Sequence, residues 1–256
     1  MTNIDLQANK KIYFASDQHF GAPTPKESKL REDRFIQWLD EIKQDAQILF
    51  LMGDLFDFWH EWKYVVPKGY VRVLGKIAEL KDADIDIYFF VGNHDLWMKN
   101  YFEDELGIPV YFQKKYYKIS GKNFLLAHGD GLGPGDKGYK RMKKLFTNPL
   151  AQWAFKWLHP DIAMKLAIYF STKNKMISGE EDKEFLGEDK EFLILYSKEK
   201  LKTEKIDYFV YGHRHLPMIL DLEGKAKYIN LGDWISYFTY GVYDGVDFKI
   251  ETFQKK

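Results

Sequence analysis

The sequence contains no cysteine, which excludes disulfide bonds and thiolate metal ligands from its 256 residues and fits a reducing compartment. It also lacks net charge, because 38 basic residues balance 38 acidic ones. Overall charge therefore predicts no nucleic-acid ligand and no strongly acidic partner. No apolar run approaches the ~20 residues that a membrane-spanning helix needs. Residues 1–11 are polar and lack the apolar core of a signal peptide.

What the sequence does have is a series of short apolar runs, typical of strands that are buried on both faces. Residues 11–16, 48–52 and 87–91 are of this kind. Helical periodicity lies between them, with one apolar face that includes Phe35 and Trp38 and a second helical segment at 68–81. Strand–helix alternation predicts parallel βαβ units, so we expect an α/β fold.

The pattern changes in the second half of the chain. Residues 116–119 and 123–127 predict a hairpin, 208–211 a further buried strand, and 227–253 antiparallel strands. Between the hairpin and the strand at 208 lies a long helical stretch. We therefore expect a single domain over 1–256, with a helical lid inserted at 132–205. The segment 21–27, rich in proline, glycine and lysine, is expected to be a loop.

Five apolar runs end in Asp, Asn or His. A lone Asp after a strand is usually a turn or helix cap, and a lone His is usually a hydrogen-bonded core residue. Five such ends in one chain favour a shared site instead. The five ends are Asp17-x-His19, Gly53-Asp54, Gly92-Asn93-His94-Asp95, His128-Gly129-Asp130 and Gly212-His213-x-His215.

Imidazole nitrogens together with carboxylate oxygens suit divalent ions such as Mn, Fe, Zn or Co. An extended backbone would place Asp17 and His19 on the same side, because side chains alternate along a strand, and the same holds for His213 and His215. Asp54 is best placed to bridge two ions. Two divalent ions and two carboxylates leave a charge of about +2, which suits a phosphate or pyrophosphate anion.

The order of these motifs resembles that of the calcineurin-like metallophosphoesterases, over Asp17 to His215. The resemblance implies two mixed β-sheets flanked by helices and two divalent ions, with Mn²⁺ preferred and Fe or Zn as alternatives. It implies catalytic roles for His94 and for Asp95 as the orienting partner of His94. The implied ligands are Asp17, His19, Asp54 and His215 for one ion, and Asp54, Asn93, His128 and His213 for the other.

The runs Gly53-Asp54-Leu55-Phe56-Asp57-Phe58-Trp59 and Asp136-Lys137-Gly138-Tyr139 are similar to one subgroup, the UDP-2,3-diacylglucosamine pyrophosphatases of lipid A synthesis. This resemblance implies hydrolysis of a UDP-linked, twice-acylated glucosamine to UMP and an acylated sugar 1-phosphate. Two departures stand out, because His94 replaces the usual Arg of the subgroup and Arg214 replaces a commoner Thr. The implied substrate-binding residues are Asn93, His94, Asp136, Tyr139, Lys173, Asn174, Lys190 and His213.

The insertion is rich in aromatic and apolar residues between Leu150 and Phe170, and Lys140, Arg141 and Lys144 precede them. These helices could form a lid with an acyl-chain groove and face anionic lipid, or could form a small helical subcore with solvated lysines. With the resemblance, they imply a cytoplasmic monomer, peripheral to the inner membrane, with no nucleic-acid partner. Two alternatives stay open: a metallophosphoesterase for another substrate, and a non-catalytic scaffold on the same fold.

Three further segments have open roles. Asp57 and Asp130 could hydrogen-bond a ligand histidine or a loop amide, or could brace their loops. The segment from Asn230 to Trp234 follows another predicted strand, and could be a plain turn or a wall of the site.

Overall fold

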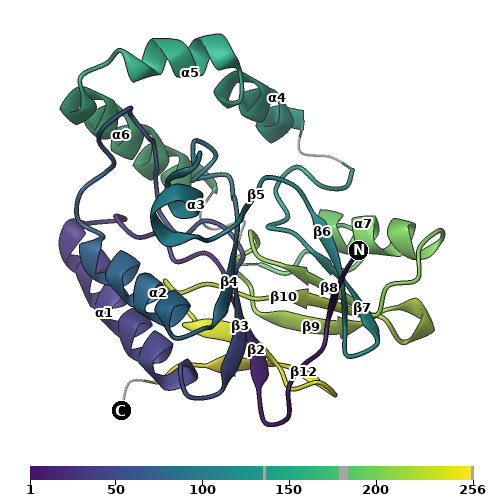
Figure 1. The fold of residues 1–256 in the computed structure, drawn as a ribbon. Helices are drawn as coiled ribbons and strands as arrows, with labels where there is room; N and C mark the ends of the chain where they lie inside the picture. The colour runs from purple at the N-terminus through teal and green to yellow at the C-terminus, as the bar shows by residue number, and fades with distance from the viewer. Residues whose placement is uncertain (135–136, 179–183, 255–256) are drawn as a thin grey trace.

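The fold was analysed in a computed structural model that describes residues 1–134, 137–178 and 184–254, with the side chains of 137–139, 142 and 172–178 outside the description. Two mixed six-stranded sheets make up its centre (Figure 1). The first sheet has the order β12-β11-β2-β3-β4-β5. Its strands are β2 (Lys11–Ala15), β3 (Ala46–Leu51), β4 (Asp86–Phe90), β5 (Val110–Tyr111), β11 (Thr239–Tyr243) and β12 (Phe248–Thr252).

The second sheet has the order β1-β6-β7-β8-β10-β9. The hairpin partners β6 and β7 pair antiparallel, whereas β8 is parallel to both β7 and β10. Its strands are β1 (Thr2–Ile4), β6 (Lys115–Ile119), β7 (Lys122–Leu126), β8 (Tyr208–Tyr211), β9 (Met218–Asp221) and β10 (Lys227–Asn230).

Alternation along the central strands explains why both of their faces are apolar. Ile12 and Phe14 of β2 point into the core between the two sheets, whereas Tyr13 and Ala15 point to the core beneath the helices. Three helices pack on that outer face, namely α1 (Pro25–Ile42), α2 (Val71–Asp82) and α3 (Tyr101–Leu106). Helix α7 (Phe192–Leu201) covers the second sheet, so helices flank the two sheets on both sides.

Most predicted strands are confirmed, and two local predictions are wrong. The segment 21–27 is not all loop, because α1 begins at Pro25, where Thr24 Oγ1 accepts a hydrogen bond from the Glu27 N–H (3.3 Å). The tail is not wholly antiparallel either, since β10 joins the second sheet parallel to β8. A 3-10 turn, η2 (Glu223–Lys225), connects β9 to β10.

The predicted insertion divides into two parts. Helix α7 packs Leu193 and Ile194 into the core of the second sheet. The helices α4 (Lys137–Phe146), α5 (Pro149–Lys156) and α6 (Pro160–Ser178) instead lie together at one end of the molecule (Figure 1). Among their described side chains, only Ala163 and Ser171 are buried. No helix in the described part of the chain is long and apolar enough to cross a bilayer.

Candidate metal centre

The five motif-bearing loops follow β2, β3, β4, β7 and β8. Because β2, β3 and β4 are parallel neighbours, and β7 and β8 are too, their carboxyl ends meet at one edge of each sheet. Backbone bonds link the loops, from Asp17 N–H to Gly53 O (3.0 Å) and from Gly212 N–H to His128 O (2.9 Å). Asp17 Oδ2 accepts from the His213 N–H (2.9 Å), which joins the loops of the two sheets.

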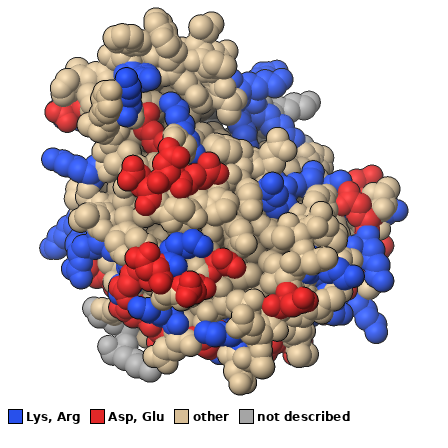
Figure 2. Space-filling model, in the orientation of Figure 1, with Lys and Arg blue, Asp and Glu red and all other residues tan. Residues whose placement is uncertain are grey.

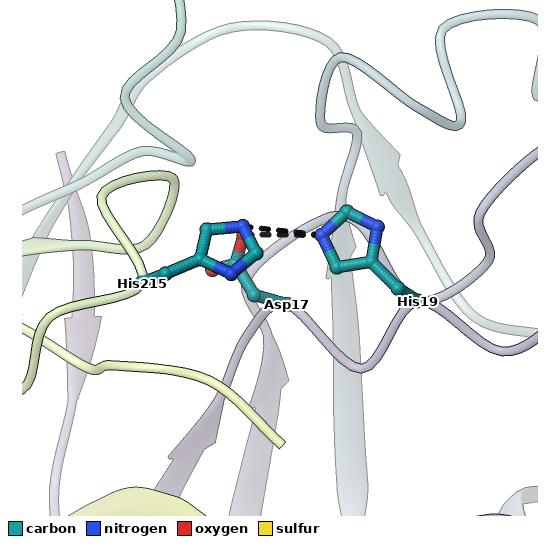
Figure 3. Close-up of side chains that lie close together, drawn as sticks. All are labelled: Asp17, His19 and His215. Atoms are coloured by element: carbon teal, nitrogen blue, oxygen red, sulfur yellow. Dashed lines mark hydrogen bonds and ion pairs between the residues drawn. The ribbon is translucent and has the colours of Figure 1, made fainter. Parts of the chain in front are cut away.

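Asp17, His19 and His215 form the first half of the cluster (Figure 3). Asp17 Oδ1 lies 3.3 Å from His215 Nε2 and 3.8 Å from His19 Nε2, and these two ring nitrogens are 3.3 Å apart. Asp17 Oδ1 is fully buried and makes no hydrogen bond within the described residues. A buried carboxylate oxygen facing two imidazole nitrogens fits a divalent cation.

Asp54 connects this half to a second group. Its Oδ2 lies 3.6 Å from His19 Nε2 and 3.4 Å from His128 Nε2. Asn93 Oδ1 in turn lies 3.2 Å from His128 Nε2 and 2.8 Å from His213 Nδ1. The structure thus brings all seven predicted ligands together around Asp54, and this His/Asp cluster is compatible with a two-metal site.

Acceptors behind the histidines set their tautomers. His128 Nδ1 lies 2.8 Å from Met52 O, and His215 Nδ1 lies 3.2 Å from Asp233 Oδ2. Both acceptors require a proton on Nδ1, so Nε2 is the ring nitrogen that is directed at the cluster. Asp233 Oδ1 accepts from the backbone N–H groups of residues 235, 236 and 237. The segment 230–234 is therefore a wall of the site, which answers a question that the sequence left open.

The ligand-bearing backbone is not extended as expected. Asp17 (φ 58°), His19 (φ 46°) and Asp54 (φ 53°) are left-handed, and so are His213 (φ 70°) and His215 (φ 50°). Residues with side chains rarely adopt this region, at a cost of about 1–3 kcal/mol each. The prediction that strand alternation aligns these side chains is therefore wrong, since tight left-handed turns direct them to the cluster.

Charge shapes the cluster strongly. Burial alone would lower the pKa of His128, but the charges of Asp54 and Asp17 raise it to about 10. Burial and the neighbouring charge of His128 lower the pKa of His213 to about 4. Burial would raise the pKa of Asp17, yet the charge of His215 and the neighbouring His19 ring hold this pKa well below its usual range. A protonated His128 thus supplies positive charge between two carboxylates.

His94 and Asp95 differ from the sequence-based expectation. Asp95 does not orient the Nδ1 side of the His94 ring, because its oxygens accept from the Gly92 N–H (2.6 Å) and the Leu55 N–H (3.0 Å). His94 Nδ1 instead lies 2.9 Å from the backbone O of Asp57, and the His94 N–H donates to Asp54 Oδ1 (2.8 Å). Asp95 therefore shapes the loop, and Asp57 orients the ring.

The remaining predicted substrate residues are less informative. Asp136 lies outside the described residues, and so do the side chains of Tyr139, Lys173 and Asn174. Lys190 is exposed, just before α7. Asp130 forms an ion pair with Lys143 of α4, so it connects the His128 loop to the insertion.

Two contacts escaped the sequence analysis. Arg214 is buried between two predicted ligands and binds Glu191 bidentately, through Nε (3.0 Å) and Nη2 (2.9 Å). Ser171 of α6 donates to Asp57 Oδ2 (2.7 Å). The Arg in place of the commoner Thr was the available signal for the first contact. The Ser171–Asp57 contact joins residues 114 positions apart, so no local sequence pattern could predict it.

Comparisons with known proteins agree with this geometry. The family model described as calcineurin-like phosphoesterase matches residues 10–217. A Porphyromonas gingivalis protein named UDP-2,3-diacylglucosamine hydrolase is 38% identical over 95% of this chain and 98% of its own length. Proteins of the same name from Histophilus somni and Photorhabdus laumondii are 26% and 27% identical, over 88% and 78% of this chain and 92% and 82% of their own lengths. The chain belongs to the calcineurin-like phosphoesterase family.

Proposed function

We propose that the chain hydrolyses the pyrophosphate bond of UDP-2,3-diacylglucosamine with two divalent ions, preferably Mn²⁺. The observation that carries the proposal is the convergence of seven N and O ligands on Asp54, in a chain that aligns over nearly its full length with a hydrolase of that name. The ligands would be Asp17, His19, Asp54 and His215 for one ion and Asp54, Asn93, His128 and His213 for the other.

When bound, the two ions supply Lewis acidity, which lowers the pKa of an attacking water and offsets charge on the phosphoryl oxygens. The protein's own part is to keep the proton of His128 and His215 on Nδ1, so that Nε2 of each is the nitrogen offered to a cation, and to place His94 beside the cluster. Because Nδ1 of His94 donates to Asp57 O, its Nε2 is left for the substrate, and the protonated ring would donate from Nε2 to a phosphoryl or leaving oxygen.

The bond changes are those of a simple hydrolysis. The water oxygen bonds to the phosphorus of the UMP part, and the bond from that phosphorus to the bridging oxygen breaks. The bridging oxygen leaves on the acylated sugar 1-phosphate, and the proton of water passes to the leaving oxygen or to solvent.

The test is to incubate the purified protein and Mn²⁺ with UDP-2,3-diacylglucosamine in ¹⁸O-labelled water. We expect UMP release, with the label in UMP, and loss of turnover in Asp54→Asn. Hydrolysis of unacylated nucleotide esters without UMP release from the lipid would instead indicate another phosphoester substrate. His94, in place of the subgroup's Arg, is the feature that favours that second candidate.

We further propose that the α4–α5 region is a lid that places the protein, as a monomer, on the cytoplasmic face of an anionic inner membrane. Leu150, Trp153 and Trp157 of the α5 region are 76%, 61% and 75% exposed. Figure 2 shows few charges over α5, and Lys and Arg side chains gathered where α4 lies. Exposed aromatic groups beside basic ones suit the interface of an anionic bilayer.

Co-sedimentation with vesicles tests the membrane proposal. We expect binding to phosphatidylglycerol vesicles that weakens with salt, and little binding to phosphatidylcholine alone. The double variant Leu150→Ser and Trp157→Ser should lose binding. Val246→Ser is the matched control, because Val246 is 74% exposed at the distant β11–β12 turn. Equal binding by both variants would contradict the proposal.

A further inference from the structure

Two adjoining hollows lie between the loop after β3 and the end of α5, and no predicted metal ligand lines either of them. Their volumes are about 330 Å³ and about 250 Å³. Both hollows are lined by Trp62, Lys63 and Lys156. The residues that line only the larger, aromatic hollow are Tyr64, Val65 and Trp157. The residues that line only the smaller, basic hollow are Glu61, Lys99 and Asn100.

The positive charge of the basic hollow is not neutralised. Within the described residues, none of its three lysines forms an ion pair. Among those residues, Glu61 is the only carboxylate that lines either hollow, and it is 7% exposed. Both of its oxygens already accept N–H groups, from the Trp59 indole (3.0 Å) and from the backbone of residues 99, 100 and 101 (2.8–3.2 Å). Three lysines against one buried glutamate leave a charge of +2 for an anionic ligand.

The neighbouring His60 gives independent evidence of this charge. Its ring is 1% exposed, and neither ring nitrogen has a hydrogen-bond partner in the described part of the chain. Burial and the charges of Lys99 and Lys156 lower the pKa of His60 to about 4. Both ammonium groups thus lie near one buried ring, which fits two cations around a common hollow.

The aromatic hollow exposes large apolar side chains. Tyr64, Val65 and Trp157 are 84%, 48% and 75% exposed. Lys63 Nζ lies 4.8 Å from the centre of the Tyr64 ring, so the basic and the aromatic side chains meet at the shared wall. Exposed apolar groups that gather beside charged ones mark an interaction site. A free phosphate ion would use only the lysines, whereas an amphiphile with an anionic head would use both hollows.

We propose that the two hollows together bind one anionic glycerophospholipid. Its phosphate would lie among Lys63, Lys99 and Lys156, and its glycerol and the start of its acyl chains would lie against Tyr64 and Trp157. A zwitterionic lipid fits less well, because it would bring its own cation next to three lysines. The lipid is a bound component of the membrane surface and not the substrate. The inference deepens the proposed membrane placement and rests on it, adding a site for a single lipid molecule.

The experiment titrates the full chain, loaded with Mn²⁺, with dihexanoyl-phosphatidylglycerol below its critical micelle concentration. Calorimetry measures the affinity and the stoichiometry. Glycerol 3-phosphate, which has an anionic head without acyl chains, and dihexanoyl-phosphatidylcholine, which has acyl chains without net charge, are titrated in parallel.

We expect one molecule of phosphatidylglycerol per chain, and affinities for the other two ligands that are weaker by about tenfold or more. The double variant Lys63→Gln and Lys156→Gln should weaken phosphatidylglycerol binding by about tenfold or more. The matched control is Lys118→Gln with Lys249→Gln, which removes the same charge from exposed lysines of β6 and β12. It should change the affinity by less than about twofold, because these lysines are remote from both hollows.

The indole N–H resonance of Trp62 locates the bound lipid. This group is buried, makes no hydrogen bond within the described residues, and belongs to a residue that lines both hollows. We expect its resonance, assigned through Trp62→Phe, to shift on binding of phosphatidylglycerol. The resonance of Trp38, which is buried beneath α1, should stay in place. A shift confined to other residues would refute the assignment of the site.

Equal losses in the two double variants would overturn the proposal, because overall charge would then explain the binding. Equal affinities for glycerol 3-phosphate and phosphatidylglycerol would overturn it as well, since the aromatic hollow would contribute nothing. Failure of the membrane placement is distinguishable, because the short-chain lipid is monomeric. A chain that binds this lipid but does not sediment with vesicles would refute the membrane placement alone. Sedimentation without binding of the monomer would refute this site alone.

Discussion

At the scale of single residues, His128 balances the charge of the cluster. Its pKa of about 10 means that it is protonated near neutral pH, between Asp54 and Asp17. A cation at Nε2 requires the neutral ring, so binding must displace that proton. The positive charge of His128 thus stabilises the metal-free protein, and the bound cation replaces this charge.

We therefore expect Mn²⁺ binding to release about one proton near neutral pH, and affinity to rise up to about tenfold per pH unit. Because the folded pKa of His128 lies above the ordinary value of 6.5, its stabilising effect is complete below about 6.5 and is lost as the pH rises towards about 10. Calorimetry in buffers of high and low ionisation enthalpy measures the release. His159→Gln, at an exposed histidine, is the control, and equal enthalpies in both buffers would contradict the expectation.

Gly92 allows its backbone to lie against Asp54. A Cβ there would overlap Asp54 Oδ1 and lie 2.7 Å from the Asp54 backbone N. We expect Gly92→Ala to displace Asp54 and to lower turnover of a small phosphodiester by about 100-fold or more. Gly75→Ala is the matched control, because its Cβ meets nothing within 4 Å on α2, and it should stabilise the protein by about 0.5–1 kcal/mol. Similar kinetics for both variants would refute this account.

At the scale of elements, Arg214 and Glu191 connect the loop after β8 to the start of α7. Their side chains are 8% and 4% exposed, and Arg214 Nη2 also donates to Glu184 O (3.1 Å). Breaking a buried ion pair typically lowers the free energy of unfolding by about 3–5 kcal/mol. The pair therefore holds the loop that carries His213 and His215.

Glu191→Gln should accordingly lower the free energy of unfolding by several kcal/mol, at the lower end of that range if Gln keeps one hydrogen bond. It should also raise the Mn²⁺ concentration needed for half-maximal activity. The control is Glu199→Gln, which removes the ion pair of the exposed Glu199 side chain with Lys202 and should leave the free energy of unfolding close to that of the parent chain. Urea titration of both variants measures the difference, and equal midpoints would disprove the role of the buried pair.

The elements also show how far the sequence could lead. Continuous apolar runs predicted β2, β3, β4 and β8 to within two residues, because strands buried on both faces have few alternatives. The motifs at their ends predicted which side chains meet. The short strands β1, β5 and β9 were not predicted, because their pairing depends on partners elsewhere in the chain.

The same limit applies within the site. The left-handed turns at Asp17 and His213 depend on the close packing of loops, and no residue preference reveals them. The Ser171–Asp57 contact depends on where α6 comes to rest, since the residues around Ser171 read only as an apolar helix. Sequence thus predicted the ligand set, and tertiary packing supplied its orientation.

At the scale of the whole molecule, two regions differ in how they are held. The two sheets and their flanking helices bury large aromatic side chains throughout, including Trp38, Trp59 and Trp234. The described side chains of α4–α6 bury less, and they contact the core through Phe155 against Trp97 (4.4 Å between ring centroids) and through the Trp97 Nε1–H bond to Phe146 O (2.6 Å). Regions with few buried contacts open at lower free energy than the global unfolding.

Phe155→Ala should therefore release α4–α6 without unfolding the core. We expect faster amide exchange in α4–α6 and unchanged protection in β2, β3 and β8. The free energy of global unfolding should change by less than about 2 kcal/mol, because Phe155 is only half-buried. Hydrogen exchange read by mass spectrometry resolves these segments. Trp157→Ala, at a 75%-exposed side chain two residues further along the chain, should change neither region. Since Ser171 lies on α6, turnover should fall together with protection in Phe155→Ala. If the helices open while turnover stays constant, the insertion and the metal cluster act independently.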